Sequence, residues 1–442
     1  MFLHSFSRYA RLGALLLVLG SIAACVEIPT FNAQPTVYLR VAVPNPIQAT
    51  YLAQRVQSFE AANPTINVEI FSQMAQFRGN LADAITNLSG TDTGLDVVYL
   101  TDSDFQSVAA AGVLTDLTPY IRESDDLGPN KFYSLALPVF QDRGRQMVMP
   151  AELYPLVIFY NQDLFDKAGI PYPTAGWTVQ DFQLAAMRLT DTSGGPQKAT
   201  YGFVSDSTLA FWPFVFAFGG DIPDPSKDPT AKVLTSAGDI QGFQFVVDLI
   251  NQDHSFPLDQ FGRGTQLFYG GRVGMALLYM NGRNVVTQQV DTRGPQPTPT
   301  PGPPQRWGFH WNVVTVPGQT SRGTLVQVAG YGIPKNAKNP DEAWQLIRYL
   351  VETLPEPGAA PGYVPALKAL AQSDAFAQLY PESGRQAYLD SVKIGKTIPA
   401  IPSTVSFTPN DIRPVLLGQV SVANALQQFQ KKWAAAFEKA AQ

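Results

Sequence analysis

The pattern of apolar and polar positions switches repeatedly between the period of a strand and the period of a helix. Val37–Val43 has the apolar character of a buried strand. Two sets of apolar residues follow, the first at helical spacing and the second alternating with polar residues: Leu52, Val56 and Phe59, then Ile66, Val68 and Ile70. Strand, helix and strand in this order predict a right-handed parallel crossover, the unit from which α/β sheets are built.

The same alternation continues to the C-terminal end of the sequence. It predicts strands at Leu95–Leu100, Leu156–Tyr160, Met275–Tyr279 and Thr324–Val328. Apolar residues at helical spacing predict further helices, the last with a stripe that faces the core: Phe77, Leu81, Ile85 and Leu88; Phe182, Ala185 and Leu189; Trp344, Ile347, Val351 and Leu354; and Val422, Leu426, Phe429, Trp433 and Phe437. Capping boxes are expected where two helices start, at Ser103 with Gln106 and at Thr178 with Asp181. The predicted fold class is therefore α/β.

Composition adds that the chain is globular and carries more acid than base. Of 442 residues, 45% are apolar and 15% are charged, which is typical of a protein with a large core. A chain of this length exceeds what one core usually sustains, so two lobes are expected. Acidic residues number 36 against 31 basic ones, which argues against a nucleic-acid partner. Three histidines and one cysteine leave little for a metal site or a histidine-based triad, and no cofactor is expected.

The N-terminal segment predicts export and lipid attachment. Arg8 and Arg11 precede an apolar run of about 14 residues, too short to cross a bilayer, and small residues lie just before Cys25. The Ile-Ala-Ala-Cys sequence resembles the bacterial lipobox, so residues 1–24 are expected to be a cleaved signal peptide and Cys25 the lipidated first residue. Acyl chains on Cys25 would hold the protein on the membrane. A plain secreted protein with an incidental free thiol is the alternative.

Two segments are expected to have no core of their own. Residues 25–35 are polar and contain proline, as a tether from lipidated Cys25 would. Residues 291–306 alternate proline with threonine, glutamine and glycine, which predicts an extended loop inserted within a lobe.

Short segments along the chain carry a family resemblance. They are Phe59–Pro64, Asp96–Tyr99, Ala111–Thr118, Phe159–Ile170 leading to Trp177-Thr178, Gly271–Met275, and Gly330–Pro334 before Ala343-Trp344. In this order they resemble family 1 of the extracellular solute-binding proteins, the substrate-capture lipoproteins of bacterial ABC importers for sugars. Phe159–Ile170 is the most specific segment, although Asn161 and Trp177 are expected to start a helix and to pack rather than to bind.

The resemblance implies a two-lobed periplasmic-binding-protein-like fold with an interlobe hinge and a ligand cleft. By segment order, lobe 1 would comprise residues 36–148 and 328–395, and lobe 2 residues 149–327 and 396–442. A solute that touches both lobes would close the cleft, and the transmembrane subunits of an ABC permease would recognise the closed form. Such a protein would act as a monomer on the extracytoplasmic face of the cell membrane and would not be an enzyme.

Candidate ligand-binding residues lie where predicted strands end at the expected cleft. Sugar rings stack on aromatic side chains, and sugar hydroxyls bond to planar polar groups. The candidates are Asn45, Asp102, Ser103, Glu152, Tyr154, Phe211, Trp212, Tyr279, Asn281 and Tyr331. Many relatives place a tryptophan shortly after the Gly271–Met275 segment, and this chain has none there. Either Tyr279 takes its place or Arg283 brings a polar or anionic contact.

Simpler roles compete with ligand binding at some of these positions. Asp102 and Ser103 are equally suited to capping a helix, and Phe211 or Trp212 to filling the core of a lobe. Two other functions also stay open. A secreted glycoside hydrolase would need two carboxylates flanking the scissile bond, and a surface lipoprotein would bind a partner without transport.

Overall fold

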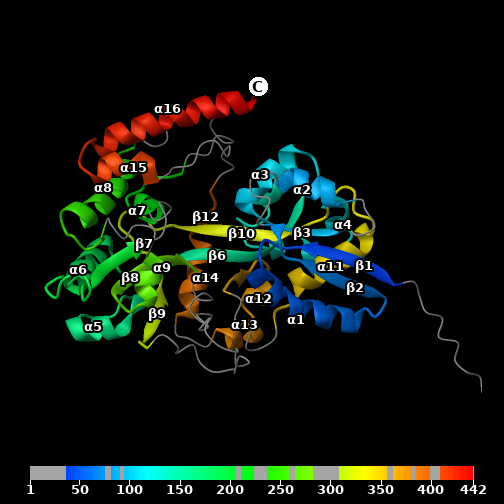
Figure 1. Ribbon diagram of the computed structural model, residues 1–442, viewed down its shortest axis with the longest axis horizontal. Helices are drawn as coiled ribbons and strands as arrows, with labels where there is room; N and C mark the ends of the chain where they lie inside the picture. The colour runs from blue at the N-terminus through cyan, green and yellow to red at the C-terminus, as the bar shows by residue number, and fades with distance from the viewer. Residues whose placement is uncertain are drawn as a thin grey trace, which may run out of the picture. The chain divides into compact units, whose positions relative to one another are not determined.

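The computed structural model describes residues 36–74, 81–89, 94–205, 211–222, 236–257, 264–281, 308–355, 362–380, 384–398 and 409–441. Residues 37–442 form one compact unit, drawn as a ribbon in Figure 1. Several sequence predictions lie outside the described residues: the signal peptide 1–24, Cys25, the tether 25–35, the proline-rich segment 291–306, Phe77 and Arg283, together with the side chains of Trp433 and Phe437.

The described strands form a ten-stranded mixed sheet and a separate two-stranded ribbon. The main path of the sheet runs β2 (Ile66–Phe71), β1 (Val37–Ala42), β3 (Val97–Thr101), β10 (Thr324–Gly332), β6 (Val148–Asn161), β8 (Val273–Tyr279) and β7 (Tyr201–Ser205). Shorter strands flank this path, with β9 (Trp311–Val314) and β11 (Val364–Pro365) on β6 and β12 (Gly395–Lys396) on β10. The ribbon pairs β4 (Gln141–Asp142) with β5 (Arg145–Gln146).

The strand directions confirm the parallel crossover. Strand β1 is parallel to β2 and to β3. Strand β10 is antiparallel to both β3 and β6, β8 is antiparallel to β6, and β7 is parallel to β8. Mixed directions of this kind are common in large sheets.

Strand β6 is long and changes partners midway. Its first part, up to Pro155, pairs with β10, and its second part, from Leu156, pairs with β8 and β9. All 14 of its residues are buried. Figure 1 shows β6 and β10 side by side, between β1–β3 at one end of the sheet and β7–β8 at the other. These two strands therefore connect the two ends of the sheet.

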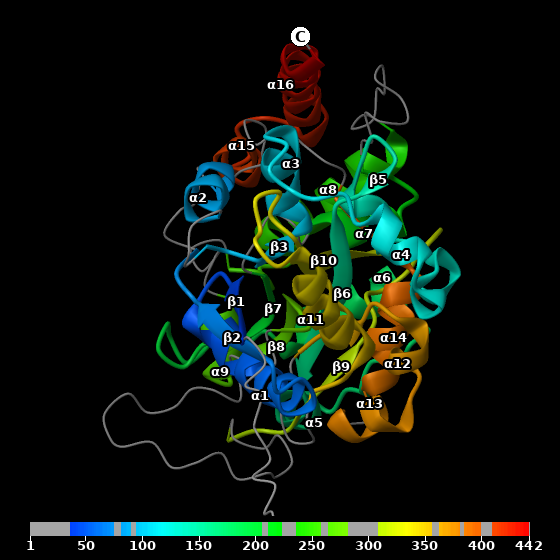
Figure 2. The ribbon, with the colours of Figure 1, turned by 90° about the vertical axis from the view of Figure 1, so that its right-hand side faces the viewer.

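Helices cover the sheet. They are α1 (Pro46–Ala62), α2 (Leu81–Leu88), α3 (Asp102–Ala110), α4 (Thr118–Arg122), α5 (Gln162–Ala168), α6 (Val179–Leu189), α7 (Phe211–Ala217), α8 (Ala237–Asn251), α9 (Gly264–Tyr269), α11 (Pro340–Glu352), α12 (Lys368–Ala371), α13 (Asp374–Leu379), α14 (Arg385–Lys393), α15 (Pro409–Leu416) and α16 (Val422–Ala441). Short 3-10 turns span Asp125–Leu127, Pro129–Lys131 and Pro138–Phe140. Figure 2 shows α11 and α14 beside β6, which both of them contact. None of the described helices is both long enough and apolar enough to cross a membrane.

Buried apolar side chains form two core clusters. The first is built on β1, β3, β10 and the start of β6, under α1 and α11. The second is built on α6, α7, α8 and the end of β6, and it includes Val422, Leu426 and Phe429 of α16. The predicted core stripe of the last helix is therefore confirmed at the positions whose side chains are described.

Helix starts confirm one predicted capping box and correct the other. Asp181 and Thr178 exchange the expected hydrogen bonds at the start of α6. At α3 the cap is Thr101, because its main-chain N and Oγ1 both donate to Asp104 at 3.3 and 2.6 Å. The prediction of Ser103 with Gln106 was wrong, since the helix begins at Asp102 and Ser103 already lies in its first turn.

Strand β8 begins two residues before the predicted Met275. Helix α11 ends at Glu352, so Leu354, predicted on its apolar stripe, lies beyond the helix but still packs against the first core.

Candidate functional site

A β-bulge places Glu152 on the face of the sheet that carries two tyrosines. Tyr99 of β3 pairs with Tyr331 of β10, so their side chains share one face. Farther along, the pairing of β10 with β6 skips Ala151, and Ala329 pairs with Glu152. Because one extra residue in a strand moves every later side chain to the opposite face, the bulge turns Glu152 toward the tyrosines.

The carboxylate of Glu152 is the centre of a buried hydrogen-bond cluster. Its Oε2 accepts from the hydroxyl of Tyr154 at 2.5 Å and from that of Tyr99 at 2.6 Å. Nε2 of Gln48, on α1, approaches the same oxygen at 3.4 Å. Glu152 is only 3% exposed, so these donors replace the water that a carboxylate would otherwise bind.

Arg55 holds the far side of the cluster in place. Its guanidinium donates to the carbonyl oxygens of Leu350 and Thr353, the latter at 2.9 Å, where α11 ends. These carbonyls lack helical donors, and a cation is favourable at a helix C-terminus. Another guanidinium nitrogen lies 3.5 Å from the hydroxyl of Tyr363. Arg55 thus ties α1, the end of α11 and Tyr363 together.

A small pocket opens onto this cluster. It is lined by Gln48, Tyr51, Leu52, Arg55, Glu152, Tyr331, Pro355 and Tyr363. The ring of Tyr331 packs edge-on against Tyr99 at 5.4 Å, and that of Tyr363 packs edge-on against Tyr154 at 6.1 Å. The pocket therefore combines aromatic walls with hydroxyl, amide, guanidinium and carboxylate groups, the combination that suits a hydroxyl-rich ligand.

Burial dominates the electrostatics of the cluster. It raises the pKa of Glu152 above the usual value, while the hydrogen bonds from Tyr154 and Tyr99 and the charge of Arg55 act in the opposite direction. Burial and the nearby charge of Glu152 raise the pKa of Tyr99 and Tyr154 well above the usual value. Both phenols therefore keep their hydrogen at neutral pH and act as donors.

Asp102 and Tyr279, predicted from separate strands, are coupled electrostatically. Asp102 follows β3, and its Oδ2 accepts from the main-chain N of Val328 on β10 at 3.3 Å. Burial raises its pKa to about 7. Tyr279 ends β8 and packs against both core clusters, and burial together with the charge of Asp102 raises its pKa. This pair connects the part of the sheet around β3 with the part around β8.

Of the remaining candidates, Asn45 and Ser103 make contacts at helix starts, and Asn281 lies on the surface. Oδ1 of Asn45 accepts from the main-chain N of Gln48 at 3.0 Å and caps α1. The hydroxyl of Ser103 lies 2.8 Å from that of Thr101 at the start of α3. Asn281 is exposed just after β8.

Phe211 and Trp212 lie in the second core. Phe211 is 1% exposed and stacks on Phe243 at 5.2 Å, and Trp212 meets the same ring edge-on at 5.9 Å. Their burial favours the core-packing alternative over contact with a ligand. The sequence alone had left both roles open.

Sequence reasoning missed Gln48, Arg55, Tyr99 and Tyr363. The first two occupy polar positions of α1, which an amphipathic pattern assigns to solvent. Tyr99 is inside a predicted buried strand and Tyr363 precedes the short strand β11. The available signal for a buried polar cluster was Arg55 itself, a charged residue one turn from the apolar Leu52 and next to Val56. Its partners could not be identified from the sequence, because Thr353 and Tyr363 lie about 300 residues away.

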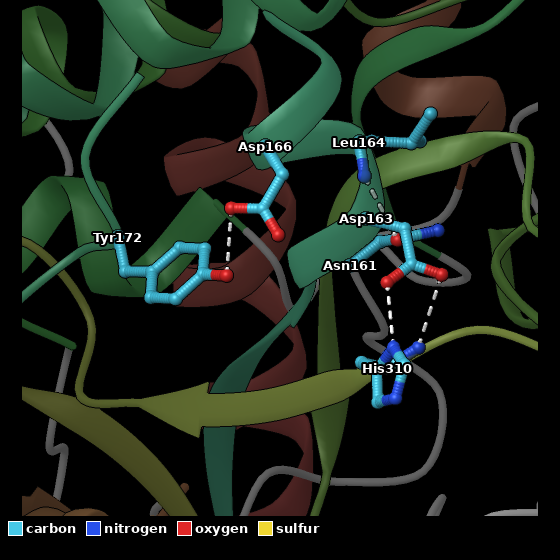
Figure 3. Close-up of polar contacts among 6 residues, drawn as sticks. All are labelled: Asn161, Asp163, Leu164, Asp166, Tyr172 and His310. Carbon is cyan, nitrogen blue, oxygen red and sulfur yellow. Dashed lines mark hydrogen bonds and ion pairs between the residues drawn. The ribbon is translucent and has the colours of Figure 1, made fainter. Parts of the chain in front are cut away.

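The most specific family segment forms a polar cluster of its own, seen in Figure 3. Oδ1 of Asn161 accepts from the main-chain N of Leu164 at 3.1 Å and caps α5, as expected. Asp163 meets Nδ1 of His310 at 2.8 Å, and Asp166 accepts from Tyr172 at 2.7 Å. These contacts explain the segment as a fold-defining element. The side chain of His310 is 69% exposed.

Trp177, the other matching residue, is buried and donates its indole N–H to the carbonyl of Thr315 at 2.8 Å. Its packing role is confirmed. Within the described ranges, no three histidine, cysteine, aspartate or glutamate side chains gather in a way that would hold a metal ion.

Comparisons with known proteins place the chain in a family. The family model described as bacterial extracellular solute-binding protein matches residues 43–353. A binding protein of Brucella abortus is 22% identical over 390 residues, which cover 84% of this chain and 85% of the relative.

Solved structures give the same fold. An ABC substrate-binding protein from Listeria monocytogenes in complex with cycloalternan has a TM-score of 0.72 at 22% identity, covering 91% of this chain and 99% of that chain. UgpB from Mycobacterium tuberculosis in complex with glycerophosphocholine has a TM-score of 0.68 at 17% identity, covering 92% and 100%. These likenesses confirm the predicted α/β fold of two-lobed periplasmic binding proteins. With the family model spanning most of its length, the chain belongs to the bacterial extracellular solute-binding proteins.

Proposed function

We propose that this protein captures a sugar or oligosaccharide in a cleft between its two lobes and delivers it to an ABC permease. The observation that carries the proposal is the Glu152 pocket, in which a carboxylate, an amide and several tyrosines surround one small space. Carbohydrates present hydroxyls that need both donors and acceptors, together with apolar ring faces that pack on aromatic side chains.

The proposed lobes follow the segment order of the family, with residues 36–148 and 328–395 as lobe 1 and residues 149–327 and 396–442 as lobe 2. Strands β6, β10 and β12 each contain one of the three proposed boundaries and would serve as hinge segments. The charge of Asp102, in proposed lobe 1, acts on Tyr279, in proposed lobe 2, which supports their assignment to the cleft. A solute that touches both lobes would favour the closed form.

Membrane attachment is part of the same proposal. Cleavage before Cys25 and lipidation of its thiol would keep the monomeric protein on the extracytoplasmic face of the cell membrane. Anchoring raises the effective concentration of a capture protein near its permease. The function requires no bond cleavage in the solute.

The ligands of similar proteins define a useful test panel. The Listeria protein was solved with cycloalternan and the Mycobacterium protein with glycerophosphocholine. The panel should therefore include cycloalternan, maltotriose, arabinotriose, glycerophosphocholine and spermidine. A carbohydrate at about 100 times its Kd would add about 2.7 kcal/mol to the free energy of unfolding and raise Tm.

The decisive measurement is the melting temperature of the purified protein with each compound, followed by small-angle scattering. A carbohydrate should raise Tm and contract the protein, and Glu152→Gln should weaken both effects. A response to glycerophosphocholine alone would replace the sugar by a phosphodiester. No shift and no contraction with any compound would favour a lipoprotein that binds without transport.

Chromogenic glycosides test the hydrolase alternative. We expect no sustained release of the chromophore. Turnover that is lost in Glu152→Gln would overturn the binding proposal and make Glu152 part of a carboxylate pair.

A further inference from the structure

We infer that solute capture at the Glu152 pocket is linked to one proton: Glu152 is ionised when the solute is bound, with a solute hydroxyl as an additional donor, and releases its proton on binding. This inference rests on the proposed function, because it assumes that a solute enters the pocket. It goes further by specifying which kind of group meets Glu152 and how pH controls the affinity.

The two carboxylate oxygens of Glu152 are used unequally. All three donors described above, from Tyr154, Tyr99 and Gln48, approach Oε2. Among the residues that the structure describes, none donates a hydrogen bond to Oε1, although Glu152 lines the pocket. The side chain thus has one fully occupied oxygen and one that is available to a group in the pocket.

The groups that face Glu152 come from every neighbouring element. Tyr99 on β3, Tyr154 on β6, Tyr331 on β10 and Tyr363 before β11 are neutral phenols, and Arg55 on α1 is the nearby cation. Gln48 on α1 is uncharged. The balance between the neutral and ionised forms of Glu152 is therefore set by burial, by these phenols and by one guanidinium.

Arg55 forms no ion pair with Glu152 among the described contacts. Its guanidinium donates to the carbonyl oxygens of Leu350 and Thr353 and approaches the hydroxyl of Tyr363. Its charge acts on Glu152 only through space. A carboxylate that is buried without a paired cation is costly to ionise, which is why burial raises the pKa of Glu152.

A further hydrogen bond to Oε1 shifts this balance. Donors stabilise the ionised form of a carboxyl group, so a solute hydroxyl at Oε1 lowers the pKa of Glu152 in the complex. On binding, Glu152 releases its carboxyl proton to solvent, and the solute hydroxyl donates a hydrogen bond to Oε1 of the resulting carboxylate. By linkage, the affinity rises with pH between the pKa of the complex and that of the free protein, by up to about tenfold per pH unit, and is constant outside that window.

The sign of the pH dependence reports the class of the solute. A hydroxyl or an ammonium group donates to Oε1 and binds more tightly as pH rises. A phosphate, carboxylate or carbonyl oxygen must accept from the protonated carboxyl and binds more tightly as pH falls. The neighbouring hydroxyl of Tyr331, for which the described residues provide no hydrogen-bond partner, can donate to the oxygen of a solute hydroxyl while that hydroxyl donates to Glu152. The pocket therefore suits a hydroxyl group.

The first arm of the test needs no solute. Infrared difference spectra between mildly acidic and neutral pH should show the carbonyl stretch of protonated carboxyls in the wild type. Glu152→Gln should remove one component of this band and leave the component of Asp102, whose pKa is about 7. Asp96→Asn is the matched control, because Asp96 is another buried carboxyl whose pKa burial raises. The carboxylate of Asp96 accepts from the main-chain N of Arg40 and of Asn339, and none of these residues belongs to the Glu152 cluster. Absence of a band assignable to Glu152 at acidic pH would overturn the inference.

The second arm is calorimetry with maltotriose, arabinotriose and cycloalternan as probes, across pH and in two buffers with different ionisation heats. The wild type and Asp96→Asn should bind more tightly as pH rises and should release a proton, whereas Glu152→Gln should lose that part of the slope. Binding with a pH profile that Glu152→Gln leaves unchanged would overturn the inference alone. Failure of every probe at every pH would instead count against the proposed function.

Discussion

Tyr154 donates its phenolic hydrogen to Oε2 of Glu152 at 2.5 Å. The two residues lie on the same strand, β6, two positions apart. Tyr99 reaches the same oxygen from β3 at 2.6 Å, although β10 lies between β3 and β6 in the sheet. One carboxylate oxygen therefore links strands that share no ladder, and the cluster should contribute to stability as well as to binding.

Removing either phenolic hydroxyl should destabilise the protein. At alkaline pH, where Glu152 is ionised, Tyr154→Phe and Tyr99→Phe should each lower the free energy of unfolding by about 1.5–3 kcal/mol, the usual contribution of a hydrogen bond to a charged group. Because both act on one oxygen, their effects should not add. Urea denaturation of the single and double variants measures this. Tyr38→Phe, at a position 72% exposed, is the control, and equal losses in all three single variants would contradict the prediction.

Arg55 should contribute far more to the free energy of unfolding than Arg348, the surface arginine of α11. Arg55→Met leaves the carbonyls of Leu350 and Thr353 without their donor and should cost about 2–4 kcal/mol. Arg348 pairs with Glu352 at 3.1 Å on a partly exposed surface, so Arg348→Met should cost less than about 1 kcal/mol. Chemical denaturation of both variants gives the comparison. Similar losses would show that Arg55 does not close the end of α11.

Gly330 should tolerate no side chain at the bulge. A Cβ at this position would lie 2.1 Å from the carbonyl oxygen of Met149 on the paired strand, so the two strands would have to separate. Gly330→Ala should cost about 3 kcal/mol or more, or prevent folding. Gly332 is the matched control on the same strand, because a Cβ there would lie 3.2 Å from its nearest neighbour, the carbonyl oxygen of Met147. The melting temperature of Gly332→Ala, measured by circular dichroism, should be well above that of Gly330→Ala.

Asp102 should make stability depend on pH. Its pKa is about 7 in the folded protein against 3.8 ordinarily, so the folded state holds the proton more tightly. The stability that this provides is present at acidic pH and is lost as pH rises from about 4 to about 7. Asn keeps an acceptor for the main-chain N of Val328 and carries no charge. Asp102→Asn should therefore be more stable than wild type at pH 8, by about 2–4 kcal/mol, and should show a flatter pH profile.

Asp181 provides a control of opposite sign. Hydrogen bonds from Thr178 hold the pKa of Asp181 below its usual value, so its contribution to stability is present at neutral pH and disappears on acidification. Asp181→Asn should thus lose stability at pH 8 and approach wild type in acid. Urea midpoints at several pH values test both variants, and parallel profiles for wild type and Asp102→Asn would refute the role of Asp102.

Cys25 should control location without affecting capture. Cys25→Ser should leave the precursor unprocessed or released from the membrane, because no thiol remains for lipid attachment. Fractionation of expressing cells and the mass of the mature N-terminus measure this outcome. The purified variant should give the same response to the carbohydrate panel as wild type. Loss of binding would mean that Cys25 contributes more than an anchor.

The sequence by itself determined the order of strands and helices, the family and the caps at Asn161 and Thr178. These features depend on neighbours a few residues apart, namely apolar periodicity and the hydrogen bonds of a single turn. The lobe crossings implied by the family resemblance selected Glu152, Tyr154 and Tyr331 as candidates. Phe211 and Trp212 were also selected, because an aromatic residue at a cleft and one in a core cannot be told apart from the sequence alone.

Only the tertiary structure decided which of these side chains meet. The bulge at Ala151 turns Glu152 toward Tyr99 and Tyr331, and a strict alternation along β6 and β10 would have placed it on the opposite face. Arg55 meets the end of α11 through contacts that span about 300 residues, as at Thr353. Strand register and helix docking depend on the packing of the whole core, so no local pattern specifies them.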